Sequence, residues 1–214
     1  MNKIFIKKNI IKGEYQHFLY HRFTRDVEWK MNQNHPFSEY EPGSIQQRSI
    51  LSDKFNSFPI YTANHMSHNI IDVRERLMYG DNMSFFFSDV IPIVHYFQKF
   101  SDFKFNYRLS NIEASLKHKK DIELKESVNQ PHIDLSHPDG YTFVYFVCDS
   151  DGDLILYNEK YKEIPYEKLT INKRIKPRMG TLVCFPSNII HSHNFPTKNP
   201  FKITIDFNII YSDF

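Results

Sequence analysis

The second half of the sequence constrains the fold most, because it consists of short strand-like runs in close succession. These apolar or alternating runs are separated by turn residues and cover 103–109, 141–147, 154–158, 170–176, 181–186, 188–193 and 201–211. Aromatic residues make up 16% of the chain, with 20 Phe and 13 Tyr, and such residues favour strands and large packed faces. The pattern predicts a mainly β protein with flanking helices, built around a double-sheet jelly roll.

The first hundred residues lack this close succession of strand-like runs and predict helices and loops. One helix is expected over 14–23, and a second over 91–100, capped by Ser88 or Asp89 with Pro92 tolerated in its first turn. Residues 32–57, rich in Pro, Ser, Asn and Gln, predict a loop. Because no repeat or flexible linker interrupts the chain, residues 1–214 are expected to form one domain, with 1–100 packed on a barrel core of 101–214.

The runs 141–147 and 154–158 are separated by a short stretch of Asp, Ser and Gly at 149–153. Such a stretch between two apolar runs predicts a β-hairpin, with Gly152 supplying a positive φ angle.

Charge and composition exclude several classes of protein. Lys and Arg number 27 against 25 Asp and Glu, and the basic residues are scattered, so no nucleic-acid-binding stripe is expected. Cys148 and Cys184 lie in apolar runs and predict buried thiols. Residues 1–15 carry too many polar groups for a signal peptide or a membrane span. We therefore expect a soluble, cytoplasmic protein without a membrane partner.

Two short segments carry residues suited to metal binding, Pro131–Asp134 and Ile190–His193. Side chains at i and i+2 of an extended segment point to the same side, so His132 and Asp134 can face one metal ion. His191 can complete the set. Two histidines and one carboxylate are the ligands of non-haem Fe(II) oxygenases, because they leave adjacent coordination positions free.

Two alternatives remain open from the residues alone. His193 lies on the same face of its strand as His191 and is a rival for the third position. A second His-x-Asp pair, His137 and Asp139, is followed by Gly140, and this context favours a turn.

The order of these features resembles that of a known family. Residues 131–210 contain His-x-Asp, a long strand, an Asp-Gly turn, a Pro-x-x-Gly turn, a distal histidine and a cation on the last strand. They are similar to the core of the 2-oxoglutarate and Fe(II)-dependent oxygenases, in particular the prolyl-4-hydroxylase-like group that includes phage-encoded members. The resemblance implies a double-stranded β-helix, with His132, Asp134 and His191 as iron ligands. His193 is then expected to support these ligands or to face solvent.

The resemblance also implies that 2-oxoglutarate chelates the iron and that its far carboxylate meets Lys202. Close relatives usually carry Arg at this position, whereas prolyl-4-hydroxylases use Lys. An ammonium holds a carboxylate as a point charge, so we expect hydroxyl partners nearby, with Thr204, Tyr107 and Tyr145 as candidates.

The implied function is an Fe(II)- and 2-oxoglutarate-dependent dioxygenase, which couples decarboxylation of 2-oxoglutarate to succinate with hydroxylation of a substrate. O2 is the second co-substrate, and ascorbate is a stimulant to test. A peptidyl proline, a free amino acid or a small metabolite would suit such an enzyme, and Arg108 is the candidate substrate contact. The alternative is a catalytically inactive jelly-roll binding module. The near-neutral charge argues against a nucleic-acid demethylase.

Overall fold

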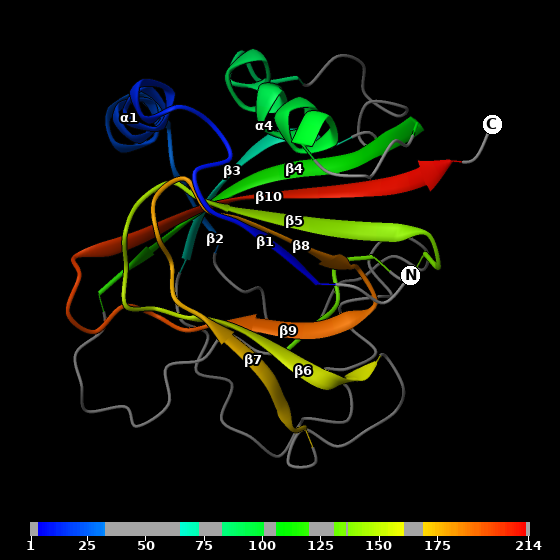
Figure 1. The fold of residues 1–214 in the computed structure, drawn as a ribbon. Coiled ribbons are helices and arrows are strands. Elements are labelled where there is room, and N and C mark those ends of the chain that lie inside the picture. Colours follow the sequence, from blue (N-terminus) through cyan, green and yellow to red (C-terminus); the bar gives the residue numbers. More distant parts are fainter. Residues whose placement is uncertain are drawn as a thin grey trace.

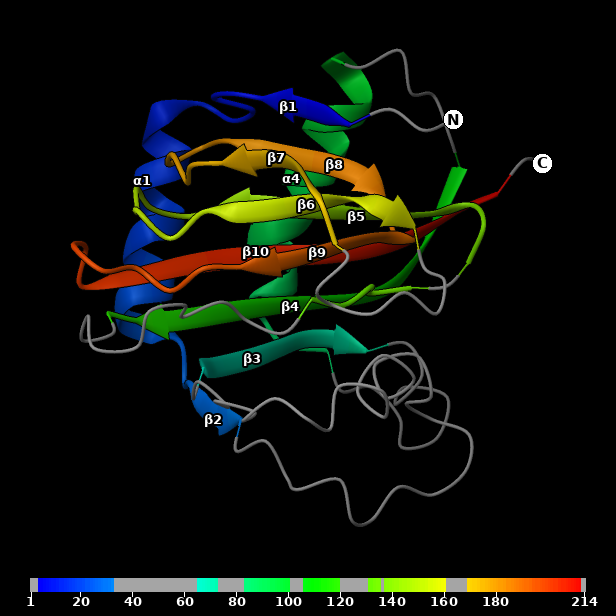
Figure 2. The same ribbon diagram turned by 90° about the horizontal axis from the view of Figure 1, so that it is seen from below.

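The structure is a computed structural model that describes residues 4–32, 65–72, 83–100, 106–119, 131–135, 137–160 and 169–212. Two antiparallel sheets face each other, and two helices cover the outer side of the larger sheet (Figures 1 and 2). The loop predicted over 32–57 lies outside the described residues, apart from residue 32, which ends a strand.

The larger sheet has seven strands in the order β1-β8-β5-β10-β4-β3-β2. Their bounds are β1 Phe5–Lys7, β2 Lys30–Asn32, β3 His65–Asp72, β4 Asn106–His118, β5 Gly140–Phe146, β8 Leu182–Pro186 and β10 Phe201–Ser212. The smaller sheet has the order β7-β6-β9, with β6 Leu154–Lys160, β7 Ile171–Ile175 and β9 Ile189–His193. This arrangement confirms the predicted jelly roll with flanking helices.

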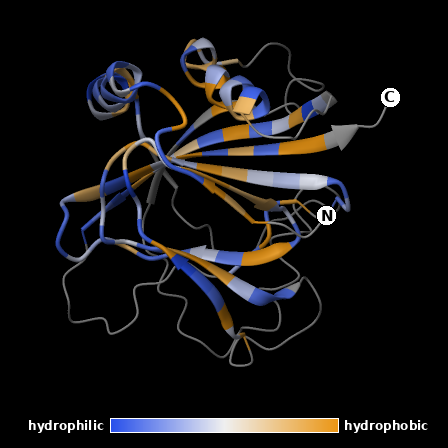
Figure 3. Ribbon diagram, in the orientation of Figure 1, coloured by the Kyte–Doolittle hydropathy of each residue, from blue (hydrophilic) through white to orange (hydrophobic). Residues whose placement is uncertain are grey.

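Alternation along the strands divides the buried side chains into two cores. The odd-numbered residues of β10 from 203 to 209 belong to the core under the helices, whereas the even-numbered residues face the smaller sheet. Figure 3 shows the resulting alternation of hydrophobic and hydrophilic positions along β10 and β4. The core between the sheets consists of Val144, Phe146, Leu154, Leu156, Ile175, Val183, Phe185 and Ile189. The face of the larger sheet that is directed at the smaller sheet is called the inner face. Polar residues on the inner face can therefore form a binding site between the sheets.

Both predicted helices are present. Helix α1 spans Gly13–His21 and continues as the π-helical turn η1, Arg22–Asp26. Helix α4 spans Phe87–Phe100, so it starts earlier than predicted and places Pro92 in its second turn. Its buried residues recur at helical spacing and face the larger sheet; they are Val90, Ile93, Val94 and Phe97. No helix in the described part of the chain has the length and apolarity that a membrane crossing requires.

Three strands in the first hundred residues correct the prediction that this region holds only helices and loops. Strands β1, β2 and β3 extend the larger sheet at its two edges. Strands β1 and β2 have three residues each, too few to show a period-2 pattern. The pairing of β3 with β4 shifts register between Asn69 and Ile71, and such an irregularity interrupts strict alternation.

The predicted hairpin between 141–147 and 154–158 is wrong. Strand β5 pairs with β10 and β8 in the larger sheet, whereas β6 pairs with β7 and β9 in the smaller one, so residues 149–153 cross between the sheets. Among the described glycines, only Gly180 has a positive φ, of 77°. A Cβ on Gly152 would lie 2.6 Å from the Asn194 carbonyl oxygen, so glycine is needed there for close backbone approach.

Asp151 ties this crossing segment to the loop that joins β9 to β10. Its carboxylate accepts the backbone N–H groups of Thr197 at 3.0 Å, Lys198 at 2.9 Å and Asn199 at 3.0 Å. The Thr197 hydroxyl donates a fourth bond at 2.7 Å. Burial alone would raise the pKa of Asp151, but these hydrogen bonds hold that pKa well below its ordinary value.

Replacing Asp151 by alanine is expected to lower the free energy of unfolding by about 2 to 4 kcal/mol, because several hydrogen bonds to one charged group are lost. Urea unfolding at pH 7 measures the difference. Because the folded-state pKa is lowered, the carboxylate stabilises the fold above its unfolded pKa of about 4, and this stabilisation disappears as the pH falls below that value. The exposed Asp139→Ala is the control, and equal stability of the two variants would contradict the interpretation.

Candidate metal centre

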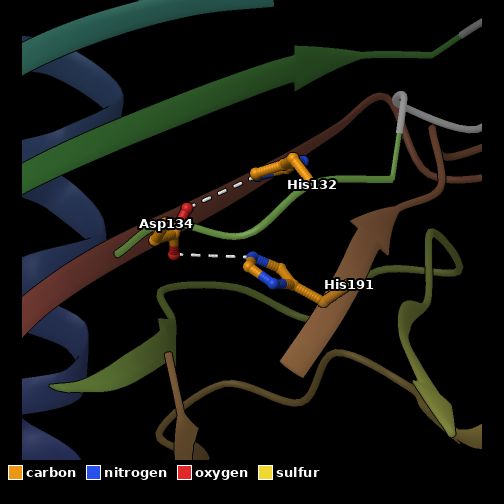
Figure 4. Close-up of side chains that lie close together, drawn as sticks. All are labelled: His132, Asp134 and His191. Carbon is orange, nitrogen blue, oxygen red and sulfur yellow. Dashed lines mark ion pairs between the residues drawn. The ribbon is translucent and has the colours of Figure 1, made fainter. Parts of the chain in front are cut away.

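The backbone brings three predicted ligands together at the edge of the smaller sheet. The His132 N–H donates to the His191 carbonyl at 3.0 Å, and the His191 N–H donates to the His132 carbonyl at 2.9 Å. This bridge places residues 131–134 beside β9, although they form no named strand. The side chains of His132, Asp134 and His191 consequently converge (Figure 4).

The three side chains are arranged around one point. His132 Nε2 lies 3.4 Å from Asp134 Oδ1, and His191 Nε2 lies 3.4 Å from Asp134 Oδ2. One possible ligand atom from each residue lies within 4.8 Å of the other two. The side chain of His132 is 22% exposed, whereas those of Asp134 and His191 are buried. The group is therefore accessible from the His132 side and enclosed on the opposite side.

Neighbouring groups orient two of these side chains. His191 Nδ1 lies 3.1 Å from the Ile189 carbonyl oxygen; an N–H donated to that carbonyl leaves the Nε2 lone pair directed at the site. The Thr142 hydroxyl lies 3.2 Å from Asp134 Oδ2 and 2.9 Å from Asn208 Oδ1, so it can donate to either oxygen. Sequence reasoning did not identify Thr142 or Asn208, which are polar residues on the inner face of two strands.

The carboxylate and the two imidazoles shift the pKa values of one another. Burial by itself raises the pKa of Asp134, but the adjacent His191 and His132 hold that pKa well below its ordinary value. Burial lowers the pKa of His191, and the Asp134 carboxylate outweighs this effect and raises it. Asp134 is therefore ionised at neutral pH, as a metal-binding carboxylate must be.

The donor set fits Fe(II). Two imidazole nitrogens and one carboxylate oxygen match the facial arrangement of non-haem Fe(II) oxygenases, which keeps three adjacent positions for other ligands. His132, Asp134 and His191 form the only such group of His, Cys, Asp or Glu within the described ranges. Cys148 and Cys184 are buried free thiols outside it.

The structure places the two sequence alternatives outside this group. His193 lies one strand repeat from His191, with ring centroids 6.2 Å apart, and it is buried between the sheets. His137 Nδ1 accepts the backbone N–H of Asp139 at 3.2 Å in the turn before β5. The Asp139 side chain there is exposed.

Lys202 and Thr204 face the smaller sheet from β10. Lys202 is 1% exposed, and its Nζ donates to the carbonyl oxygens of Gly152 at 2.7 Å and Asn194 at 2.6 Å. Thr204 is also buried, and its Oγ1 lies 3.5 Å from Asp206 Oδ2. Both predicted co-substrate residues are thus on the same sheet face, toward which His191 is directed from β9.

Two predicted hydroxyl partners lie on the opposite face, which corrects the prediction that they contact the co-substrate. Tyr145 belongs to the core under the helices, and Tyr107 packs against that core. Because side chains alternate along a strand, Tyr145 points away from the face that carries Phe146 and Thr204. Arg108 is exposed near the start of β4, opposite Ile210 of β10.

Asp206 is a further inner-face residue that sequence reasoning missed. Its Oδ1 is buried and has no hydrogen-bond partner in the described structure. Burial raises the pKa of Asp206 to about 7, and the negative charge of Asp134 is the second largest contribution to this increase. The signal in the sequence is the polar residue at every second position of 202–208.

Asp206→Asn is expected to stabilise the metal-free protein by about 2 to 4 kcal/mol at pH 8. Burial raises the pKa of Asp206 to about 7, so keeping this carboxyl ionised at pH 8 costs the folded protein free energy. The folded-state pKa is above the unfolded one, so the stability of wild type falls as the pH rises from about 4 to 7. The advantage of the variant should therefore shrink between pH 8 and pH 5. Urea unfolding at both values, with a chelator present, tests this. An unchanged difference would contradict it, and Asp139→Asn is the exposed control.

No protein-family model matches the sequence, and no curated protein is similar to it in sequence. Solved structures with the same fold are nonetheless found. The chain superposes on SnoN, a non-heme alpha ketoglutarate dependent epimerase from nogalamycin biosynthesis, with a TM-score of 0.56 and 10% identity, over 98% of this chain and 76% of SnoN. A second SnoN structure contains Fe3+, alpha ketoglutarate and nogalamycin RO.

Two prolyl hydroxylases share the fold. The Pseudomonas putida prolyl-4-hydroxylase superposes with a TM-score of 0.52 and 9% identity, over 100% of this chain and 95% of the enzyme. The Trichoplax adhaerens prolyl hydroxylase, in complex with a hypoxia inducible factor peptide fragment, gives 0.50 and 13%, over 100% and 84%. At such low identities the similarity concerns the fold. The chain therefore has the double-stranded β-helix fold of the 2-oxoglutarate and Fe(II)-dependent oxygenases, prolyl hydroxylases included, in agreement with the resemblance of its sequence.

Proposed function

We propose that this protein is an Fe(II)- and 2-oxoglutarate-dependent dioxygenase that hydroxylates a small molecule or a peptide. The observation that carries the proposal is the group formed by His132, Asp134 and His191 on the inner side of this fold, here called the metal group. Two imidazoles and an ionised carboxylate on a rigid sheet edge have no evident structural purpose, whereas they suit Fe(II).

Different residues of the chain would bind the metal ion, orient its ligands and exclude water. His132, Asp134 and His191 would hold Fe(II), which when bound supplies the coordination sites and redox chemistry for 2-oxoglutarate and O2. Thr142 and the Ile189 carbonyl keep two of the ligands oriented. The Phe185 ring lies 5.0 Å from the His191 ring and shields this side of the site from water.

The co-substrate would lie between the sheets. Lys202 and Thr204 face this space, and we assign to them the far carboxylate of 2-oxoglutarate. The inner face around them is buried, and burial strengthens a charge-assisted hydrogen bond.

Two solved structures with the same fold support a small molecule or a peptide as the substrate. SnoN was solved with nogalamycin RO and the Trichoplax enzyme with a peptide, so this fold serves small molecules and peptides alike. In this chain the accessible side of the metal group is that of His132. We retain Arg108, exposed on β4, as the substrate contact.

The test is succinate release by the purified protein with Fe(II), 2-oxoglutarate, O2 and ascorbate. The panel should contain proline-containing peptides, free amino acids and small metabolites, with the product identified by mass spectrometry. Stimulation by one compound, and its absence in Asp134→Ala, would support the proposal. Absence of both metal binding and 2-oxoglutarate binding in wild type would overturn it in favour of a binding module.

A further inference from the structure

Two buried lysines lie directly opposite each other on neighbouring strands. Lys117 of β4 pairs with Lys202 of β10 in the antiparallel register, and they are 4% and 1% exposed. Opposite residues of antiparallel strands have Cβ atoms about 4.5 to 5.5 Å apart and share one face. Leu116 and Ile203 belong to the core under the helices, so both lysines face the smaller sheet.

A third basic side chain faces these lysines from the smaller sheet. His193 of β9 is buried, and its Nδ1 has no hydrogen-bond partner in the described part of the chain. The Lys117 ammonium also lies 5.9 Å from the centroid of the Phe195 ring, just beyond β9. Three basic groups from three strands therefore converge between the sheets.

This basic cluster, defined as Lys117, Lys202 and His193, has the chemistry of an anion site. Lys202 uses two of its three N–H groups on carbonyl oxygens, which leaves one for a ligand. Burial and then the charge of Lys117 lower the pKa of Lys202 well below its ordinary value. An anion beside both ammonium groups would offset the desolvation and the repulsion together.

The cluster lies next to the metal group. His191 and His193 are two residues apart on β9, and their ring centroids are 6.2 Å apart. The side chains of the cluster and of His191 are all buried between the two sheets, with His193 beside His191. Because a carboxylate has two oxygens, two ammonium groups on adjacent strands can each face one of them.

We infer that Lys117 is a second binding residue for the far carboxylate of 2-oxoglutarate, acting beside Lys202. The inference rests on the proposed function, and it assigns to this chain a two-lysine anchor in place of the single cation implied by its resemblance. A two-lysine anchor selects for a 2-oxo acid with a second negative charge, because each lysine can donate a charge-assisted hydrogen bond to one oxygen of the far carboxylate.

The test measures the affinity of Mn(II)-loaded protein for 2-oxoglutarate by calorimetry. Lys117→Met keeps the length and apolar stem of the side chain and should weaken binding by about 10- to 100-fold, because Lys202 would still hold the carboxylate. Lys117→Arg, which keeps the charge, should recover part of the affinity. Lys173→Met removes an exposed lysine on β7 and should match wild type.

A second ligand separates a direct contact from a structural effect. 2-Oxopentanoate keeps the metal-binding end and the chain length but lacks the far carboxylate, so Lys117→Met should not weaken its binding. Equal weakening for both ligands, or unchanged 2-oxoglutarate affinity in Lys117→Met while Lys202→Met loses it, would overturn the inference and leave the proposed function standing. No affinity of wild type for 2-oxoglutarate would overturn both. Should Lys117→Met fail to fold, Lys117→Gln serves the same comparison.

Discussion

Alanine at His132, Asp134 or His191 is expected to abolish both tight metal binding and succinate formation. Each residue supplies one of three donors that lie within 4.8 Å of one another, and a two-donor site cannot hold a labile metal ion firmly. Asp134→Ala should be the most severe change, because it also removes the negative charge between the imidazoles. Mn(II) titration followed by calorimetry, together with a succinate assay, measures both effects.

Two controls and one further variant test whether the prediction is specific to these three residues. His137→Ala and Asp139→Ala change the second His-x-Asp pair, which lies in the turn before β5, and should retain metal binding. His193→Ala should reduce metal binding or turnover by about 10- to 100-fold, as expected for a residue that supports the ligands. Complete loss in His193→Ala, with His191→Ala still active, would exchange the roles of these histidines.

Lys202→Ala is expected to weaken 2-oxoglutarate binding by about 2 to 5 kcal/mol, because a buried carboxylate would lose its charged partner. Mn(II) affinity should be nearly unchanged, since no Lys202 atom belongs to the metal group. Lys202→Arg should bind more tightly than the alanine variant but less tightly than wild type. Its planar head does not fit the space where an ammonium now donates to two carbonyl groups.

The same carbonyl bonds require a stability control. Loss of the Lys202 ammonium leaves the Gly152 and Asn194 carbonyl oxygens without this donor, so thermal unfolding must be measured for each variant. The exposed Lys173→Ala is the matched surface change. If folded Lys202→Ala bound 2-oxoglutarate as tightly as wild type, the anchor would lie elsewhere, with Lys117 as the next candidate.

The sequence by itself determined the fold class and predicted the three side chains that the structure brings together. Short alternating runs from Phe103 onward predicted the jelly roll, and the apolar spacing around Val94 predicted helix α4; both are local patterns with a fixed period. The metal group was predictable because His132 and Asp134 are two residues apart in an extended segment. Its third member, His191, was found through the order of the motifs, with His193 left open.

Only the tertiary structure decided which strands pair and which face each side chain takes. The turn at 149–153 looked like a hairpin, yet β5 and β6 lie in different sheets, because pairing depends on contacts distant in sequence. A shift of one residue in register turns a strand over, so the orientation of Tyr145 toward the helices could not be derived from its own segment. The position of Lys117 opposite Lys202 likewise depends on the register between β4 and β10, which the sequence of either strand alone does not give.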